Sequence, residues 1–222
     1  MIRLHHCHQT RSMRVLWLLH ELGVDFELTV HPFDKSLRSK DYLKHSPAGR
    51  VPALELDGVQ LFESTAIIQI LCAKFPEKGI GRVEQDSDWA EWLVWLNFAE
   101  TISQHTAALT QQHIALYDDY MRSPTVMKIE AARIGKCFDA LESHLMKSGE
   151  EKEYILNAGF SAADIALAQA VFMARYFQHL EAWPATLSWY ERATDRPAFR
   201  ASLPPANAQL LYAQPFYEVR DA

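Results

Sequence analysis

Two adjacent side chains, Glu63 and Ser64, have the types and the spacing to bind a small zwitterion. Apolar residues follow at helical spacing, so Ser64 is expected to cap a helix with its hydroxyl. The positive helix end and that hydroxyl would bind a carboxylate, while Glu63 would bind an ammonium group close by. An α-amino acid head group carries both charges at that separation. The alternative interpretation is that the pair only begins a helix.

A proline lies near the start of the strand predicted just before this pair. That strand covers residues 51–56, and Asp57-Gly58 joins it to a second strand at residues 59–62, because Asp-Gly between apolar runs is typical of a two-residue hairpin. Pro52 cannot donate to a sheet and belongs at an edge or a bend. If the Val51-Pro52 bond is cis, the Val51 backbone could pair with an extended ligand; an ordinary trans proline is the alternative.

In its order and spacing this stretch resembles the glutathione site of cytosolic glutathione transferases. In that family the residue before a cis-proline pairs with the cysteinyl backbone of glutathione, and an acid–serine pair holds the γ-glutamyl end. The resemblance therefore implies that Val51, Pro52, Glu63 and Ser64 bind glutathione. It also extends to a later capping box at residues 161–164 and to a late helix that begins near residue 197, so it covers nearly the whole chain.

The elements around this site predict a thioredoxin-like N-terminal domain over residues 1–76. Strands are expected at residues 2–6 and 26–30, a helix at 12–22, a short helix near 41–44, and then the hairpin and its helix. A strand, a crossover helix and another strand imply a parallel pair, and the hairpin adds an antiparallel edge. This α/β pattern is the thioredoxin-like arrangement.

The rest of the chain predicts an all-α C-terminal domain over residues 87–222. Residues 77–86 are rich in glycine and charge and are interpreted as a linker. Beyond them the pattern indicates helices from Trp89 towards Tyr117, at residues 125–147, from Ser161 and from Pro197, with no convincing strand. The two domains together give the glutathione transferase fold that the resemblance implies.

Three residues at the start of the first helix are candidates to activate a thiol. The thiol of glutathione has an unperturbed pKa of about 8.5, and a hydroxyl donor and a helix end need to lower it by only about one or two units. The resemblance to theta-type enzymes aligns Thr10 with their catalytic serine, and many bacterial and fungal relatives have Ser-Arg-Ser here. Ser12 is the alternative donor or a plain N-cap. Arg11 would add positive potential or be a solvated surface arginine.

Other binding residues are expected on the strength of the resemblance. The glycyl carboxylate of glutathione needs a cation, and the candidates are Lys35, Arg38, Lys40 and Arg50. The electrophile pocket would take its walls from the helical domain, and the residues expected there are His105, Tyr117, Trp183 and Phe216. Each of these residues has an ordinary alternative, either as a solvated charge or as part of the core.

The histidines and cysteines near the N-terminus do not predict a metal site. Side chains alternate along a strand, so of the histidines at positions 5, 6 and 8 only His6 and His8 could share a face, and no second cluster completes a ligand shell. Cys7 comes too early to act as the catalytic thiol of cysteine-type relatives. The three separated cysteines suit a reducing compartment.

Composition narrows the class of protein. A net charge of -6 without a basic stripe argues against nucleic acid as a partner, and the N-terminus has neither a signal-peptide core nor an apolar run that spans a membrane. These features predict a cytoplasmic protein, and the family resemblance implies a homodimeric glutathione transferase acting on small apolar electrophiles or peroxides, as in detoxification. The alternatives are a glutathione-dependent peroxidase or disulfide reductase, and a glutathione-binding regulatory protein without catalysis.

Overall fold

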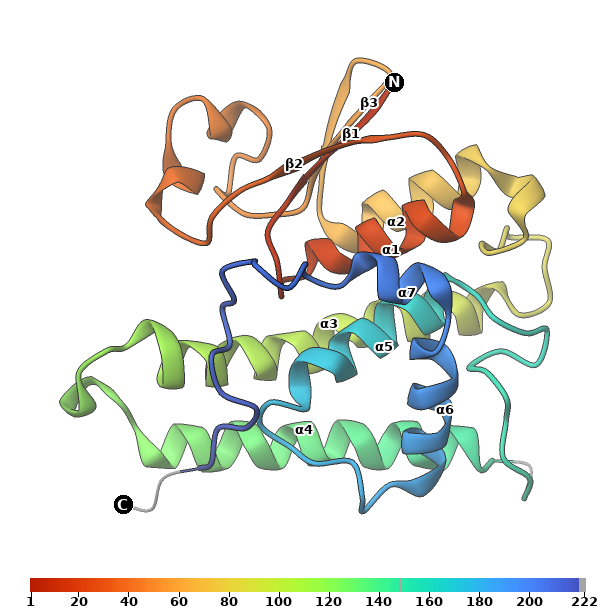
Figure 1. Ribbon diagram of the computed structural model, residues 1–222. Helices are drawn as coiled ribbons and strands as arrows, with labels where there is room; N and C mark the ends of the chain where they lie inside the picture. Colours follow the sequence, from red (N-terminus) through yellow and green to blue (C-terminus); the bar gives the residue numbers. More distant parts are fainter. Residues whose placement is uncertain (148, 220–222) are drawn as a thin grey trace. The chain divides into compact units, whose positions relative to one another are not determined.

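The computed structural model describes residues 1–147 and 149–219 (Figure 1). Its elements in the first part of the chain alternate between strands and helices, as predicted. They are β1 (Ile2–His6), α1 (Ser12–Leu22), β2 (Glu27–Val30), η1 (Lys35–Arg38), η2 (Tyr42–Lys44), β3 (Ala53–Leu56), β4 (Val59–Phe62), α2 (Ser64–Lys74) and η3 (Pro76–Lys78).

Helices make up the regular structure of the later part, where the described residues contain no strand. These helices are α3 (Trp89–Thr110), which continues as a π-helical turn (Gln111–Ala115), η5 (Asp119–Met121), α4 (Pro124–Leu145), α5 (Ala162–Ala174), α6 (Pro184–Thr194) and α7 (Pro197–Ser202). The α/β thioredoxin-like arrangement followed by an all-α region is therefore confirmed. No helix of the described residues has the length and apolarity needed to cross a membrane.

The four strands form one mixed sheet in the order β2-β1-β3-β4. β1 runs parallel to β2 and antiparallel to β3, and the hairpin adds β4 at the edge. The turn between β3 and β4 has positive φ at both central residues, Asp57 at 51° and Gly58 at 87°, as a two-residue hairpin turn requires. The hairpin prediction is confirmed, although β3 begins at Ala53, just after Pro52, rather than at Val51.

The two faces of the sheet differ in character because side chains alternate along each strand. α1 and α2 cover one face of the sheet (Figure 1), and Leu4 and Leu54, which are paired in register and fully buried, are assigned to that face. Arg3 and His5 point to the other face, and the register places Glu55 directly opposite Arg3 on that face. The helix-covered face carries the core of this region, and the other face carries charged and imidazole groups.

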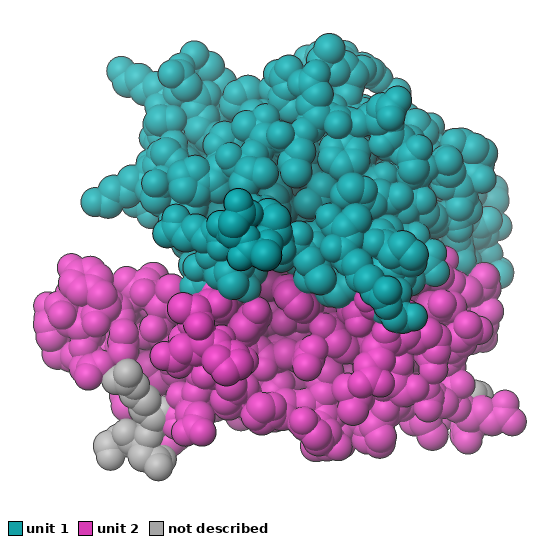
Figure 2. Space-filling view, in the orientation of Figure 1, with its two compact units in different colours: residues 1–92, 195–211 teal, residues 93–194, 212–222 magenta. Residues whose placement is uncertain are grey.

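The chain divides into two compact units (Figure 2). Unit 1 contains residues 1–92 and 195–211, and unit 2 contains residues 93–194 and 212–222. Residues 195–211 belong with unit 1 because α7 packs on α1: the rings of Trp17 and Phe199 meet edge to face at 4.9 Å, and Arg196 donates to both oxygens of Glu21 at 2.7 and 2.8 Å. The domain limits 1–76, 77–86 and 87–222 stay predictions.

The capping box predicted in unit 2 is confirmed at the start of α5. The Ser161 hydroxyl accepts from the backbone of Ala163, and the Asp164 carboxylate accepts from the Ser161 backbone. Asp164 is fully buried and also accepts from the Ile155 backbone and from Nε1 of Trp189, both at 2.9 Å. One carboxylate thus connects the start of α5, the segment before it and α6.

Candidate functional site

The loop between β1 and α1 contains a network of hydroxyls and imidazoles centred on Ser12. Its Oγ lies 2.8 Å from Nδ1 of His6 and 2.8 Å from Oγ1 of Thr10, and it accepts from the Cys7 backbone N–H at 3.1 Å. Ser12 is fully buried. The interpretation of Ser12 as a plain N-cap is wrong, because the cap position is Arg11 and the Ser12 hydroxyl binds residues before the helix.

Thr10 is the half-buried hydroxyl of this network. Its Oγ1 donates to the Cys7 carbonyl at 2.8 Å and accepts from the Ser12 backbone N–H at 3.3 Å. The Ser12 hydroxyl also lies 3.1 Å from the Cys7 carbonyl, in donor geometry. The Thr10 proton can therefore turn to another acceptor while Ser12 takes its place on that carbonyl. This exchange is what a hydroxyl needs if it is to donate to a bound ligand.

The N-termini of α1 and α2 lie side by side and are joined by a buried guanidinium. Arg14 is fully buried, and its Nη1 donates to Oγ of Ser64 at 3.4 Å. The prediction that Ser64 is an N-cap is wrong: Ser64 is the first residue of α2, Glu63 occupies the cap position, and the Ser64 hydroxyl faces Arg14 instead. Two positive helix ends and a guanidinium make this region suited to anions.

The residues before both helices have unusual backbone conformations. Gln9, before α1, has φ 54°, and Glu63, before α2, has φ 71°. Positive φ is uncommon outside glycine, and such residues cluster at functional sites. The Glu63 side chain is exposed, as a carboxylate that binds an external ammonium group must be.

The Val51-Pro52 peptide bond is cis, which confirms that prediction. Pro52 is buried and Val51 is half-buried, immediately before β3. The cations predicted nearby, Lys35, Arg38, Lys40 and Arg50, are all exposed. Arg50 is tied to η2 through its backbone, because its carbonyl accepts from the Tyr42 hydroxyl at 2.8 Å. The structure does not single out one of the four as a carboxylate ligand.

The four residues predicted for the electrophile pocket have separate neighbours within unit 2. Nδ1 of His105 lies 2.6 Å from Oε2 of Glu130; Trp183 packs edge to face on Phe138; Phe216 stacks on His179; and Tyr117 is 76% exposed. Their assignment to a common pocket stays a prediction.

Cys7 and its neighbouring histidines, His6 and His8, are buried or half-buried within unit 1. Cys7 is buried, and burial raises the pKa of its thiol to about 11, so it is protonated at neutral pH. His6 and His8 lie close together, with Nε2 of His6 3.3 Å from Nδ1 of His8, although β1 ends at His6 and His8 lies in the turn that follows. Burial lowers the pKa of His6 to about 3, and the neighbouring His8 contributes to this shift. His6 is therefore a neutral partner for Ser12.

Arg14 and Gln9 are the site residues that pattern reasoning missed. The signal for Arg14 was available, because a single arginine stands within the apolar run of residues 13–19 and a charge there needs a partner. Gln9 gave no such signal, since its positive φ depends on how β1 turns into α1.

Comparison with known proteins agrees with this geometry. Family models described as "Glutathione S-transferase, N-terminal domain" and "Glutathione S-transferase, C-terminal domain" match residues 4–79 and 107–192. Glutathione S-transferase 3 of Schizosaccharomyces pombe is 28% identical over 211 residues, which cover 90% of this chain and 86% of that protein.

Two solved structures extend the similarity. The glutathione transferase URE2P6 from Phanerochaete chrysosporium, in complex with oxidized glutathione, is 25% identical with a TM-score of 0.79, over 90% of this chain and 94% of that one. A sphingomonad glutathione S-transferase complexed with glutathione is 25% identical with a TM-score of 0.75, over 90% of this chain and 96% of that one.

A thioredoxin-like sheet with a cis-proline before β3, followed by a helical region, defines the fold class of the glutathione transferases. Both family models match in the order expected along the chain, one on each side of residue 100. The chain belongs to the glutathione S-transferase family.

Proposed function

We propose that the protein binds glutathione in unit 1 and activates its thiol for attack on a small apolar electrophile or a peroxide. The observation that carries this proposal is the pairing of the two helix N-termini through Arg14 and Ser64. Glutathione brings two groups that need positive potential, the γ-glutamyl carboxylate and the thiolate. The start of α2 suits the carboxylate and the start of α1 suits the sulfur.

Recognition of the γ-glutamyl end would use both members of the Glu63-Ser64 pair. Ser64, backed by Arg14, would hold the carboxylate, and the exposed Glu63 would hold the ammonium group. The backbone of Val51 would pair with the cysteinyl residue. The solved relatives that contain glutathione support this assignment, since their similarity covers 90% of the chain.

Thr10 is the proposed donor to the sulfur. Ser12 is fully buried and already holds His6 and the Cys7 backbone, whereas Thr10 is half-buried and can exchange its carbonyl partner. Arg11, at the cap position of α1, would add positive potential near the sulfur. A hydrogen bond to a thiolate favours the ionised form and so lowers the pKa of the bound thiol.

Two further groups of residues, one in each unit, complete the proposal. One of Lys35, Arg38, Lys40 and Arg50 would bind the glycyl carboxylate, and the pocket residues His105, Tyr117, Trp183 and Phe216 would receive the electrophile.

We also propose a homodimer, consistent with apolar side chains that are exposed in each unit, such as Phe62 and Val94. The three cysteines are buried and free, which fits the cytoplasm.

Calorimetric titration with glutathione, followed by turnover with an aryl halide and with cumene hydroperoxide, tests the proposal. Binding with turnover of the aryl halide supports a conjugating transferase. Turnover of the hydroperoxide alone favours the peroxidase alternative, and binding without turnover favours a regulatory protein. Absence of binding in the folded protein would remove the assignment of the site altogether.

A further inference from the structure

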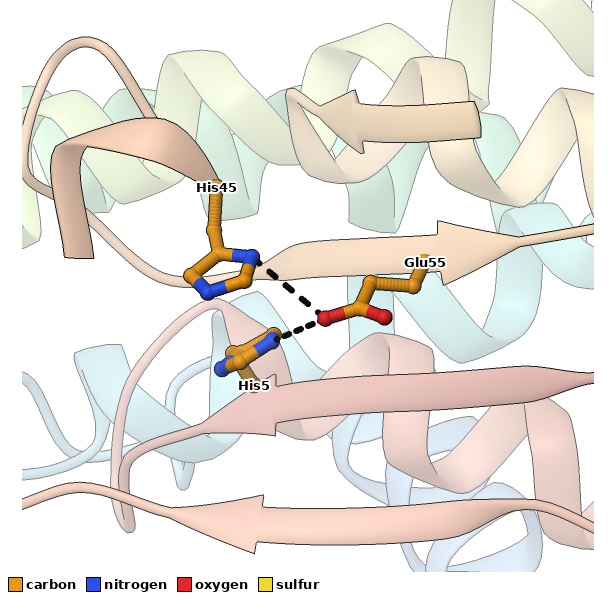
Figure 3. A group of neighbouring side chains, drawn as sticks. All are labelled: His5, His45 and Glu55. Atoms are coloured by element: carbon orange, nitrogen blue, oxygen red, sulfur yellow. Dashed lines mark hydrogen bonds and ion pairs between the residues drawn. The ribbon is translucent and has the colours of Figure 1, made fainter. Parts of the chain in front are cut away.

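A second group of chemically capable side chains lies on the sheet face opposite α1 and α2. His5 lies on β1, Glu55 lies on β3, and His45 is the residue that directly follows η2 (Figure 3). Nε2 of His5 lies 3.2 Å from Oε1 of Glu55, and Nδ1 of His45 lies 3.4 Å from the same oxygen. Two imidazoles from different parts of the chain thus converge on one carboxylate oxygen.

These separations match the edges of a metal coordination shell. A tetrahedral ion with bonds of about 2.0–2.1 Å places its ligand atoms about 3.3–3.4 Å apart. The two measured edges are 3.2 and 3.4 Å, and all three ligand atoms lie within 4.8 Å of one another. In the structure Nδ1 of His45 also lies 3.1 Å from Oε1 of Gln60, and the His45 ring stacks on the His5 ring with 4.2 Å between ring centres. An ion would therefore take the place of the Gln60 contact and turn the His45 ring towards itself.

The residues behind the ligands hold them in place. Nδ1 of His5 lies 2.9 Å from Nε2 of His31, which leaves Nε2 of His5 for a metal when the Nδ1 proton is donated to His31. Arg3 donates to the other carboxylate oxygen of Glu55 at 3.4 Å and so directs Oε1 towards the histidines. The Tyr42 ring meets both His31 and His5 edge to face, at 4.9 and 6.0 Å between ring centres.

We propose that Nε2 of His5, Nδ1 of His45 and Oε1 of Glu55 bind a divalent transition-metal ion of the zinc type. Two imidazoles and a carboxylate form a ligand set that Zn²⁺ uses, with a fourth position left for water. The side chains of Glu55 and His45 are 23% and 29% exposed, so solvent reaches the site, whereas His5 is 6% exposed. The ion would fasten the segment around η2 to the strands β1 and β3.

Metal titration of the full-length protein tests this site without any reference to glutathione. After treatment with a chelator, Zn²⁺ is titrated by calorimetry, and Co²⁺ is titrated by visible absorption, which is strong for four-coordinate and weak for six-coordinate ions. We expect one Zn²⁺ per chain, the strong absorption with Co²⁺, and a higher melting temperature with Zn²⁺ than without it.

His45→Ala is the informative variant, because it removes a ligand that is partly exposed and lies outside the four strands. We expect roughly a hundredfold or greater loss of Zn²⁺ affinity. Replacing even a residue that only hydrogen-bonds to a metal ligand commonly lowers metal affinity 10–100-fold. His179→Ala is the matched control, because it removes an exposed histidine of unit 2 that is not a proposed ligand. Both variants therefore keep nine of the ten histidines of the chain. Circular dichroism of each variant without metal checks that the fold is kept.

Three outcomes would overturn the proposal. The wild-type protein binds no Zn²⁺; His45→Ala binds it as tightly as His179→Ala does; or Co²⁺ gives only the weak absorption of a six-coordinate ion. In each case the group would be a hydrogen-bonded cluster of histidines and a glutamate. If His45→Ala does not fold, Glu55→Gln takes its place, because it keeps the shape of the carboxylate and removes its charge.

Discussion

Replacing Thr10 by valine tests how the thiol is activated. Valine keeps the branched shape and removes the hydroxyl. The Cys7 carbonyl loses the donor at 2.8 Å but keeps the Ser12 hydroxyl at 3.1 Å, so we expect the fold to survive. The proposed contacts of glutathione with Glu63 and Ser64 are untouched, so binding should persist while the thiol loses its donor.

The expected magnitude follows from the kind of bond that is lost. A hydrogen bond to a charged group contributes about 1.5–3 kcal/mol, and one pKa unit corresponds to about 1.4 kcal/mol. The pKa of bound glutathione should therefore rise by about one to two units in Thr10→Val. Because the thiolate is the nucleophile, turnover at neutral pH should fall roughly tenfold to a hundredfold.

The assay is the ultraviolet absorbance of the thiolate of bound glutathione, measured against pH. Thr10→Ser is the matched control, since it keeps the hydroxyl and should leave the titration near that of the wild type. Ser12→Ala leaves the Cys7 N–H without its 3.1 Å acceptor, so it should mainly reduce the free energy of unfolding, by about 1–3 kcal/mol. If Thr10→Val leaves the titration unmoved in a folded, glutathione-binding protein, Thr10 is not the donor. The backbone N–H groups and Arg11 would then remain to stabilise the sulfur.

Four further expectations can be checked independently. Glu63→Ala should weaken glutathione binding by about 1.5–3 kcal/mol in calorimetry without altering the fold, because this side chain is exposed; equal affinity would argue against its role. Arg14→Met should weaken the same binding by about 1–3 kcal/mol, with partial recovery in Arg14→Lys, because the guanidinium supports Ser64. Asp164→Ala should lower the free energy of unfolding by at least about 3 kcal/mol in urea denaturation. It leaves three buried N–H groups, which each donate to the Asp164 carboxylate at 2.9 Å, without an acceptor; Asp164→Asn should cost less. Light scattering at micromolar concentration should give the mass of a dimer, and a monomer would refute that assembly.

Features that depend on near neighbours in sequence could be predicted. The Asp57-Gly58 hairpin and the capping box of Ser161 and Asp164 are correct because their hydrogen bonds join residues a few positions apart. The cis Val51-Pro52 bond was predicted through the family resemblance, since local chemistry alone favours trans.

Features that depend on tertiary contacts were mistaken or missed. Ser12 and Ser64 have the residue type of N-caps, but their hydroxyls bind groups that the fold brings near, His6 and Arg14. The grouping of His5 with Glu55 depends on the register of β1 against β3, which residue spacing does not reveal. The contact of His6 with His8 joins residues two positions apart, but it forms in the turn after β1 and does not depend on alternation along a strand.

The packing of α7 on α1 has a consequence for how the protein is made. A ribosome releases residues 1–92 long before residues 195–211, yet Trp17 and Glu21 find Phe199 and Arg196 only in that late segment. The nascent sheet region must therefore wait, with an apolar surface of α1 uncovered, until nearly the whole chain has emerged. An expression fragment that stops after α2 would carry the same uncovered surface permanently, so cutting the chain between the sheet region and the helical region would yield an aggregation-prone product.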